Sequence, residues 1–253
     1  MVMFLGEYVL YNGDTEKIIY RVISKNEEKI ELQGLNYRKK IVVQASMVKQ
    51  INNEIYKSEE EKNNLYSSKM LFRNKKNQCL LGTVLHFDSD KEYLNRCLDF
   101  YKSVGIYCYP ILCEAEKISF KLNELDLNFI PDVIVITGHD YYNGENPREI
   151  ENYSNSRHFI EAVKMAKIKY CNSVIIAGAC QSHFEALLAS GANFASSPKR
   201  INVHVYDPAI IAANVCTTSI RSVVDYKKIE KYIIDLKNAY GGVETFGKMK
   251  MLY

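Results

Sequence analysis

The sequence predicts an α/β protein in which a mostly parallel sheet carries helices on both faces, preceded by a small N-terminal β-barrel. Residues 1–50 hold short strand-like segments with Gly or Asn turns about every eight to twelve residues, which is typical of a small barrel. From residue 79 onward, continuous apolar runs alternate with segments of helical spacing. That alternation indicates a parallel sheet that is buried on both faces.

The predicted barrel, of the Tudor type, consists of four strand-like segments within residues 1–50. A turn at Asn12-Gly13-Asp14 separates the first two segments, and a polar turn around Asn26 separates the second from the third. Such a module would either bind a partner or serve as a folded cap, and the sequence leaves both roles open. The segments are Glu7–Tyr11, Lys17–Ser24, Lys29–Gln33 and Lys40–Gln44.

Residues 51–78 differ from both neighbouring parts because apolar residues are sparse and Lys57–Asn64 is strongly polar. We expect a linker here, with at most a helical turn, and a domain boundary. The sequence therefore divides into a barrel at 1–50, a polar linker at 51–78 and an α/β domain at 79–253.

The α/β domain reads as strands and helices in alternation. Ligands of such sheets bind beyond the carboxyl ends of the strands, so residues that follow strands are the candidates for a site. The predicted strands are Leu80–Phe87, Gly105–Cys113, Asp132–Thr137, Ser173–Ala179, Asn193–Ser197 and Asn202–Tyr206. The predicted helices are Asp90–Ser103, Lys117–Asn128, Asn155–Ile168 and Gln181–Ser190.

Composition excludes several classes of function. The chain of 253 residues has 33 Lys and Arg against 30 Asp and Glu, and this near-balance gives no case for nucleic-acid binding. No run of apolar residues is long enough to span a membrane, and the start lacks the basic region of a signal peptide. Seven irregularly spaced cysteines without a Cys-x-x-Cys pair favour reduced thiols in an intracellular protein, and neither a metal nor a cofactor is expected.

An imidazole and a thiol follow two successive strands of the predicted sheet. His139 follows the third apolar run, and Cys180 follows the fourth. If these strands are parallel neighbours, both side chains lie in one crevice. A thiolate attacks a carbonyl while a nearby imidazole takes and returns the proton, so the pair suits covalent catalysis. The alternative is a buried strand-end cysteine and a histidine that bonds to a backbone carbonyl.

The surroundings of Cys180 add three expectations. A helix beginning at Gln181 would place its N-terminus at the thiol and favour the anion. The small residues 177–179 would leave the backbone open to a substrate carbonyl. The backbone N–H of Cys180 and one near Asp140 are candidates for an oxyanion site. His183 is expected at the surface or in a helix cap.

The third predicted strand ends in Thr137-Gly138-His139-Asp140 and the fourth in Ala179-Cys180. The order of the elements and these two motifs resemble the caspase/clostripain-like clan of cysteine peptidases, in which one strand ends in His-Gly and the next in Ala-Cys or Ser-Cys. More specifically, the chain is similar to the YabG family of sporulation-specific peptidases over most of residues 79–253. The segments that carry this resemblance are Val135–Asp140, Ala177–Glu185, Gly191–Pro198 and Ile201–Pro208.

The resemblance implies a caspase-like fold and an endopeptidase that trims spore-coat and related proteins in sporulating bacteria, cleaving after Arg or Lys. At the matching positions, Cys180 is the nucleophile and His139 the general acid and base. Protein substrates and the mother-cell cytoplasm, with possible coat association, are further implications. The resemblance leaves the oligomeric state open.

Two departures from the family pattern concern the substrate site. Asp140 stands where a glycine usually follows the histidine, which puts the second oxyanion donor in question. No acidic residue directly precedes Cys180, so a pocket for a basic substrate residue needs another carboxylate. The candidates are Asp88, Asp90 and Asp207, and helix capping is the alternative for the first two. If the enzyme cleaves after basic residues, Arg73, Lys75 and Lys76 are candidate self-processing sites.

Two other functions remain open from the sequence. An amidotransferase-like cysteine hydrolase would take its histidine from after the cysteine, and His204 would have to fill that role. A non-catalytic coat or scaffold protein would use the barrel to bind a partner and Cys180 as a structural residue.

Overall fold

The structure is a computed structural model that describes residues 5–26, 28–68 and 79–252. The chain divides into two compact units, residues 1–69 and 70–253, and the boundary falls inside the predicted linker. Among the described helices, none is both long and apolar enough to cross a membrane.

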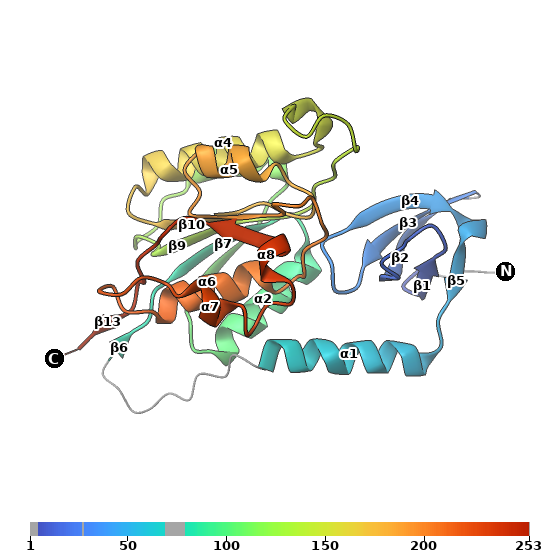
Figure 1. Cartoon of the computed structure of the whole chain (residues 1–253), viewed down its shortest axis with the longest axis horizontal. Helices are drawn as coiled ribbons and strands as arrows, with labels where there is room; N and C mark the ends of the chain where they lie inside the picture. Colours follow the sequence, from blue (N-terminus) through green and yellow to red (C-terminus); the bar gives the residue numbers. More distant parts are fainter. Residues whose placement is uncertain (1–4, 27, 69–78, 253) are drawn as a thin grey trace. The chain divides into compact units, whose positions relative to one another are not determined.

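The first unit is a five-stranded antiparallel sheet in the order β4-β3-β2-β1-β5 (Figure 1). The four predicted strand segments are confirmed, and β5 adds a fifth after the 3-10 turn Ala45–Met47. The predicted closed barrel is not shown, because β4 and β5 occupy opposite edges of the sheet. The strands are β1 (Tyr8–Tyr11), β2 (Ile19–Lys25), β3 (Lys29–Gly34), β4 (Lys40–Gln44) and β5 (Val48–Gln50).

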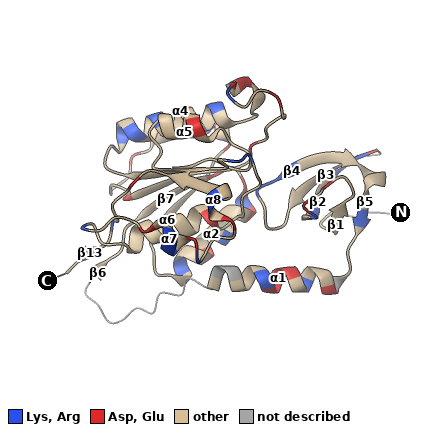
Figure 2. Ribbon diagram, viewed as in Figure 1, with Lys and Arg blue, Asp and Glu red and all other residues tan. Residues whose placement is uncertain are grey.

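Helix α1 (Asn53–Ser68) occupies most of the segment that the sequence predicts as a linker. Acidic and basic side chains both lie along α1 (Figure 2), so its sequence has no apolar stripe that would predict a helix. Two local interactions anchor it. Asn52 accepts a hydrogen bond from the backbone of Ile55 at 2.9 Å, and the ring of Tyr56 stacks on Tyr8 with centroids 4.3 Å apart. The self-processing candidates Arg73, Lys75 and Lys76 lie outside the described residues.

The second unit is built on a six-stranded sheet in the order β12-β11-β10-β9-β7-β8. The five strands β7 to β11 run parallel and β12 runs antiparallel, so the predicted mostly parallel sheet is confirmed. A separate two-stranded sheet joins β6 (Cys79–Leu80) to β13 (Lys250–Met251). The six strands are β7 (Val84–Asp88), β8 (Cys108–Leu112), β9 (Val133–Ile136), β10 (Val174–Ala177), β11 (Phe194–Ser196) and β12 (Tyr240–Gly242).

Helices cover both faces of this sheet, as predicted (Figure 1). Helices α4 and α5 lie on one face, whereas α2, α6 and α7 lie on the other. Alternate strand residues such as Phe87, Ile136 and Ile175 pack into the core beneath α4. The helices are α2 (Lys91–Ser103), α3 (Ala115–Glu124), α4 (Ser156–Lys169), α5 (Phe184–Ala189), α6 (Asp207–Thr217), α7 (Tyr226–Ile229) and α8 (Leu236–Ala239).

The predicted strand Asn202–Tyr206 is wrong. Only His204 forms a single bridge there, and the segment leads directly into α6, which the sequence analysis missed. The backbone N–H of Val203 donates to the sulfur of Cys180 instead of to a neighbouring strand. The antiparallel strand β12 takes the place beside β11. Residues 207–216 of α6 are all buried, so its apolar sequence lacks the amphipathic period that reveals a helix.

The strand order determines where a site can lie. Strand β7 has β8 on one side and β9 on the other, so the winding of the sheet reverses between β7 and β9. In open α/β sheets, the crevice at the carboxyl ends of the strands beside such a reversal is the usual ligand site. His139 and Asp90 follow the two strands that flank it.

Candidate active site

His139 and Cys180 leave the sheet at the same level. Strands β9 and β10 are parallel neighbours, and their register pairs Ile136 with Ala177. Each candidate residue lies three positions beyond its member of this pair. The prediction that the two strands are neighbours is therefore confirmed, and the imidazole and the thiol both follow the same edge of the sheet.

A carboxylate orients the imidazole of His139. The Nε2 atom lies 3.1 Å from Oδ2 of Asp90, and the ring of Tyr93 lies beside it with centroids 5.6 Å apart. The side chain is 16% exposed, so it stays within reach of a substrate. In the neutral ring that donates Nε2–H to Asp90, the lone pair is on Nδ1, which is then the atom that can accept a proton.

Asp90 has a second role, because its other oxygen caps helix α2. Oδ1 accepts hydrogen bonds from the backbone N–H groups of Glu92 at 3.0 Å and Tyr93 at 3.2 Å. The capping alternative is thus confirmed for Asp90. One carboxylate fixes the start of α2 and the orientation of His139 together.

Gly138 permits this approach of the two loops. A Cβ atom at this position would collide with the hydroxyl of Ser89, which directly precedes Asp90. The absence of a side chain at 138 therefore lets the loop after β7 lie against the loop after β9.

The other two pocket candidates are buried near the same edge. Asp88 is fully buried, and its Oδ1 accepts the backbone N–H of Asp90 at 3.0 Å. Its Oδ2 lies 3.8 Å from Nε2 of the buried His86. Asp207 is 1% exposed and accepts the backbone N–H of His204 at 2.9 Å.

Cys180 lies on a strained turn and is only 1% exposed. Its sulfur accepts the backbone N–H of Val203 at 3.3 Å and donates to the carbonyl of the same residue at 3.8 Å, so the thiol is bonded within its own loop pair. Gln181 has a φ of +59°, which is uncommon for a residue with a side chain and typical of functional turns. Because the sulfur is buried, a substrate carbonyl reaches it only after a local rearrangement.

Two sequence expectations about Cys180 need correction. Helix α5 begins at Phe184, not at Gln181, so no helix N-terminus stands at the thiol. The small residues 177–179 do not leave the backbone open, because they are buried against their neighbours. A Cβ at Gly178, whose φ is +104°, would overlap the hydroxyl of Ser196, and Ala179 is fully buried. The capping role expected for His183 is confirmed, since Nδ1 accepts the N–H of Ala186.

The carboxylate of Asp140 accepts four hydrogen bonds from three segments of the chain. Oδ1 accepts the backbone N–H of Tyr141 at 2.9 Å and that of Asn155 at 2.8 Å. Oδ2 accepts the hydroxyls of Ser156 and Ser182, the latter at 2.9 Å. A buried carboxylate with this many donors is firmly fixed.

The two serines extend this network to both sides of Cys180. Ser182 Oγ also accepts the N–H of Ala179 at 2.9 Å, and Ser156 Oγ accepts the N–H of His183 at 2.8 Å. Asp140 therefore ties the loop that carries His139 to the loop that carries Cys180. Sequence reasoning considered only its backbone, because nothing local links residue 140 to serines 16 and 42 positions away.

Comparisons with known proteins show the family of the chain. The model of the family described as YabG peptidase U57 matches residues 6–253. A curated relative, the sporulation-specific protease YabG of Bacillus subtilis (strain 168), is 37% identical over 201 residues. The matched region covers 78% of this chain and 69% of the relative.

Asp140 predicts a pH dependence of stability. Burial raises the pKa of Asp140, although hydrogen bonds from Ser156, Asn155 and Ser182 oppose the shift. The folded protein then holds this proton more tightly than the unfolded chain. The stabilising contribution is complete below the unfolded pKa of about 3.9 and is lost as the pH rises through the folded value. The unfolding free energy of Asp140→Asn, relative to wild type, should therefore increase with pH, by at most ~1.4 kcal/mol per pH unit.

Urea denaturation between about pH 4 and pH 7 measures this difference. Asp99→Asn, at a carboxylate that is 79% exposed, serves as the control for loss of a surface charge. A difference that grows as the pH falls would show that folding favours the ionised carboxylate, contrary to the prediction.

Proposed function

The chain belongs to the YabG family of sporulation peptidases, and we propose that it is a cysteine endopeptidase with Cys180 as nucleophile and His139 as general acid and base. The observation that carries this proposal is the pairing of β9 with β10, which brings both residues to one edge at the same register. The bond between His139 and Asp90 supports it further, because an orienting carboxylate is a common partner of a catalytic imidazole.

The proposed reaction follows the usual course of thiol acyl transfer. His139 accepts the proton of Cys180 as the sulfur attacks the carbonyl carbon, and Asp90 stabilises the imidazolium. The backbone N–H groups of Cys180 and Asp140 are the proposed oxyanion donors. His139 then gives its proton to the leaving amine, and a thioester to Cys180 remains. Water activated by His139 hydrolyses this thioester and restores the thiol.

The proposed specificity is cleavage after Arg or Lys. The candidates for receiving the substrate cation are Asp88, Asp90 and Asp207, of which Asp90 also bonds to His139 and caps α2. Asp207 follows the segment in which Val203 contacts Cys180, which favours it over Asp88. Spore-coat and related proteins are the proposed substrates, and the mother-cell cytoplasm, with coat association, is the proposed location.

We also propose that the second unit has a caspase-like fold and that the first unit is related to the small β-barrels. The parallel order β8-β7-β9-β10-β11 supports a caspase-like domain. For the first unit, the short connection Ala45–Met47 between β4 and β5 supports a relative of the small barrels, although the two strands are not paired.

One observation favours the alternative function, an amidotransferase-like hydrolase that uses His204. Because Val203 bonds to the sulfur of Cys180, the neighbouring His204 also comes near the nucleophile, as an amidotransferase-like hydrolase would require. Its Nδ1 accepts the backbone N–H of Tyr206 at 3.3 Å, which ties the ring to its own loop. This local bond favours a structural role for His204 and leaves His139 as the better base.

A panel of peptides tests the catalytic assignment. Peptides with Arg, Lys, Asp or Leu before the cleavable bond are incubated with wild type, Cys180→Ala, His139→Ala and His204→Ala. We expect wild type to cleave after Arg or Lys, and the first two variants to lose a factor of about 10³ or more in kcat/KM, while His204→Ala stays active. No cleavage by wild type would sink the peptidase assignment and favour a scaffold. Loss with His204→Ala but not His139→Ala would favour the alternative hydrolase.

The dual role of Asp90 gives a sharper test. Asp90→Ser keeps a capping oxygen for α2 but removes the carboxylate from His139. Activity should fall by a factor of about 10² to 10⁴, while the unfolding free energy changes by less than ~1 kcal/mol. Asp90→Ala, which loses the cap as well, is the matched control. Full activity of Asp90→Ser would show that this carboxylate does not serve the imidazole.

Self-processing in the segment after α1 is part of the proposal and is tested by intact mass. Prolonged incubation of the active 29.2 kDa chain should release the first unit. Cys180→Ala and the triple variant Arg73→Gln, Lys75→Gln, Lys76→Gln should stay whole. Wild type that keeps its full mass would refute the idea.

A further inference from the structure

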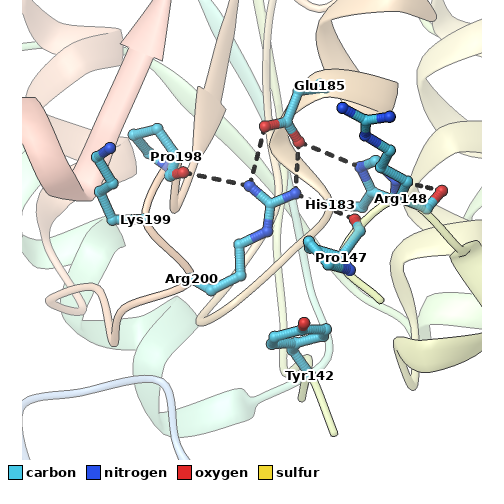
Figure 3. A pocket seen from close by; sticks show the side chains of 8 residues that line it. All are labelled: Tyr142, Pro147, Arg148, His183, Glu185, Pro198, Lys199 and Arg200. Carbon is cyan, nitrogen blue, oxygen red and sulfur yellow. Dashed lines mark hydrogen bonds and ion pairs between the residues drawn. The ribbon is translucent and has the colours of Figure 1, made fainter. Parts of the chain in front are cut away.

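A cavity of about 660 Å³ lies among the loops that follow β9, β10 and β11. We call it the anion pocket, because positively charged side chains outnumber negatively charged ones in its lining. All three loops leave the carboxyl edge of the sheet, which is the edge that carries His139 and Cys180. The pocket is lined by Tyr142, Pro147, Arg148, His183, Glu185, Pro198, Lys199 and Arg200 (Figure 3).

Arg200 and Glu185 form an ion pair at the centre of the anion pocket. Arg200 donates from both terminal nitrogens to the carboxylate of Glu185, and its Nε donates to the hydroxyl of Tyr153 at 2.9 Å. Its remaining donors bond to the carbonyls of Pro147 and Pro198. All five N–H groups of this guanidinium are therefore used, and Arg200 holds the pocket together rather than binding a ligand.

Two further cations remain available. Arg148 and Lys199 are exposed, and in Figure 3 they flank the pair of Glu185 and Arg200. Within the described residues, neither the guanidinium of Arg148 nor the ammonium of Lys199 has a hydrogen bond or an ion pair. The lining thus presents an excess of positive charge, which would attract an anion.

The lining of the anion pocket also includes Tyr142, Pro147 and Pro198, and stacked rings fix one side of it. Tyr142 stacks on Tyr153 with ring centroids 4.9 Å apart, and the ring of His183 also lies 4.9 Å from that of Tyr153. Nε2 of His183 lies 3.3 Å from the carbonyl of Arg148, which fixes that loop against α5. A cavity of this size has room for more than a single inorganic ion.

The anion pocket is connected directly to the turn that carries the nucleophile. The backbone N–H of Tyr142 donates to the side chain of Gln181 at 3.2 Å, and the N–H of Gln181 donates to the carbonyl of Ile201. Gln181 follows Cys180, and Ile201 follows Arg200. The pocket is therefore close enough to Cys180 for residues near the cleaved bond of a bound polypeptide to reach it.

We propose that the anion pocket is a substrate subsite that binds the carboxylate of an Asp or Glu side chain, a few residues from the cleaved bond. Arg148 and Lys199 would supply charge-assisted hydrogen bonds, and the tyrosine and proline walls would contact the adjacent chain. The inference rests on the proposed peptidase function. It makes the preferred substrate a segment with a basic residue at the cleaved bond and an acidic residue nearby.

Matched peptides test this subsite. Each keeps Arg before the cleaved bond and carries Glu or Gln at one position, scanned over five residues on either side. For wild type we expect one or two positions at which Glu raises kcat/KM about five- to tenfold over Gln, mainly through KM. The preference should shrink at high salt, because the two cations are exposed. In the variant Arg148→Gln, Lys199→Gln, the Glu-to-Gln ratio should fall to about one.

The cavity beside α6 and α7 supplies the control. It is lined in part by the exposed lysines 228 and 231, so Lys228→Gln, Lys231→Gln removes the same charge elsewhere and should keep the wild-type ratio. Wild type that cleaves Glu and Gln peptides equally would overturn the subsite but leave the peptidase function standing. A Glu preference that survives in Arg148→Gln, Lys199→Gln would also overturn it.

A binding measurement separates the subsite from catalysis. Cys180→Ala is titrated with the same peptides, and tighter binding of the Glu peptide that depends on Arg148 and Lys199 supports the pocket. If wild type cleaves no peptide, the proposed function fails, and this binding ratio alone decides the subsite: equal binding of Glu and Gln peptides refutes it.

Discussion

The buried carboxylate of Asp140 is the interaction on which the geometry of the site depends. Burying a charge is costly, and four donors from three chain segments offset part of this cost here. The same donors therefore fix the loop after β9, the start of α4 and the turn after β10. Together with the bond from the N–H of Tyr142 to the side chain of Gln181, this carboxylate holds the loop of His139 against the loop of Cys180.

The sheet supplies the rest of the arrangement. Parallel pairing of β9 with β10 sets the level at which the imidazole and the thiol emerge, and the reversal of winding beside β7 brings Asp90 to the imidazole. Gly138 makes that approach sterically possible. Strand order thus brings the candidate residues to one edge of the sheet, and contacts of individual side chains then fix their positions.

The sequence predicted the parts that follow from periodicity and strand ends. The strands β7 to β11, the emergence of His139 and Cys180 at one edge of the sheet and the capping role of His183 could all be inferred, because each leaves a local signal. Helix α6 could not, since burial on every side removes its period, and α1 could not, since it has no apolar stripe. The bond from Val203 to Cys180 and the serine partners of Asp140 are long-range contacts, which one sequence does not reveal.

The pairing of β6 with β13 joins residues 79–80 to residues 250–251, so the second unit has its own entrance and exit strands hydrogen-bonded to each other. The two ends of the second unit are therefore held together by this pairing. Cutting the polypeptide ahead of residue 79 would leave β6 paired with β13, so the new chain end would stay hydrogen-bonded to the rest of the second unit. A circular permutant that links residue 252 to residue 79 through a short flexible loop would preserve the same connectivity.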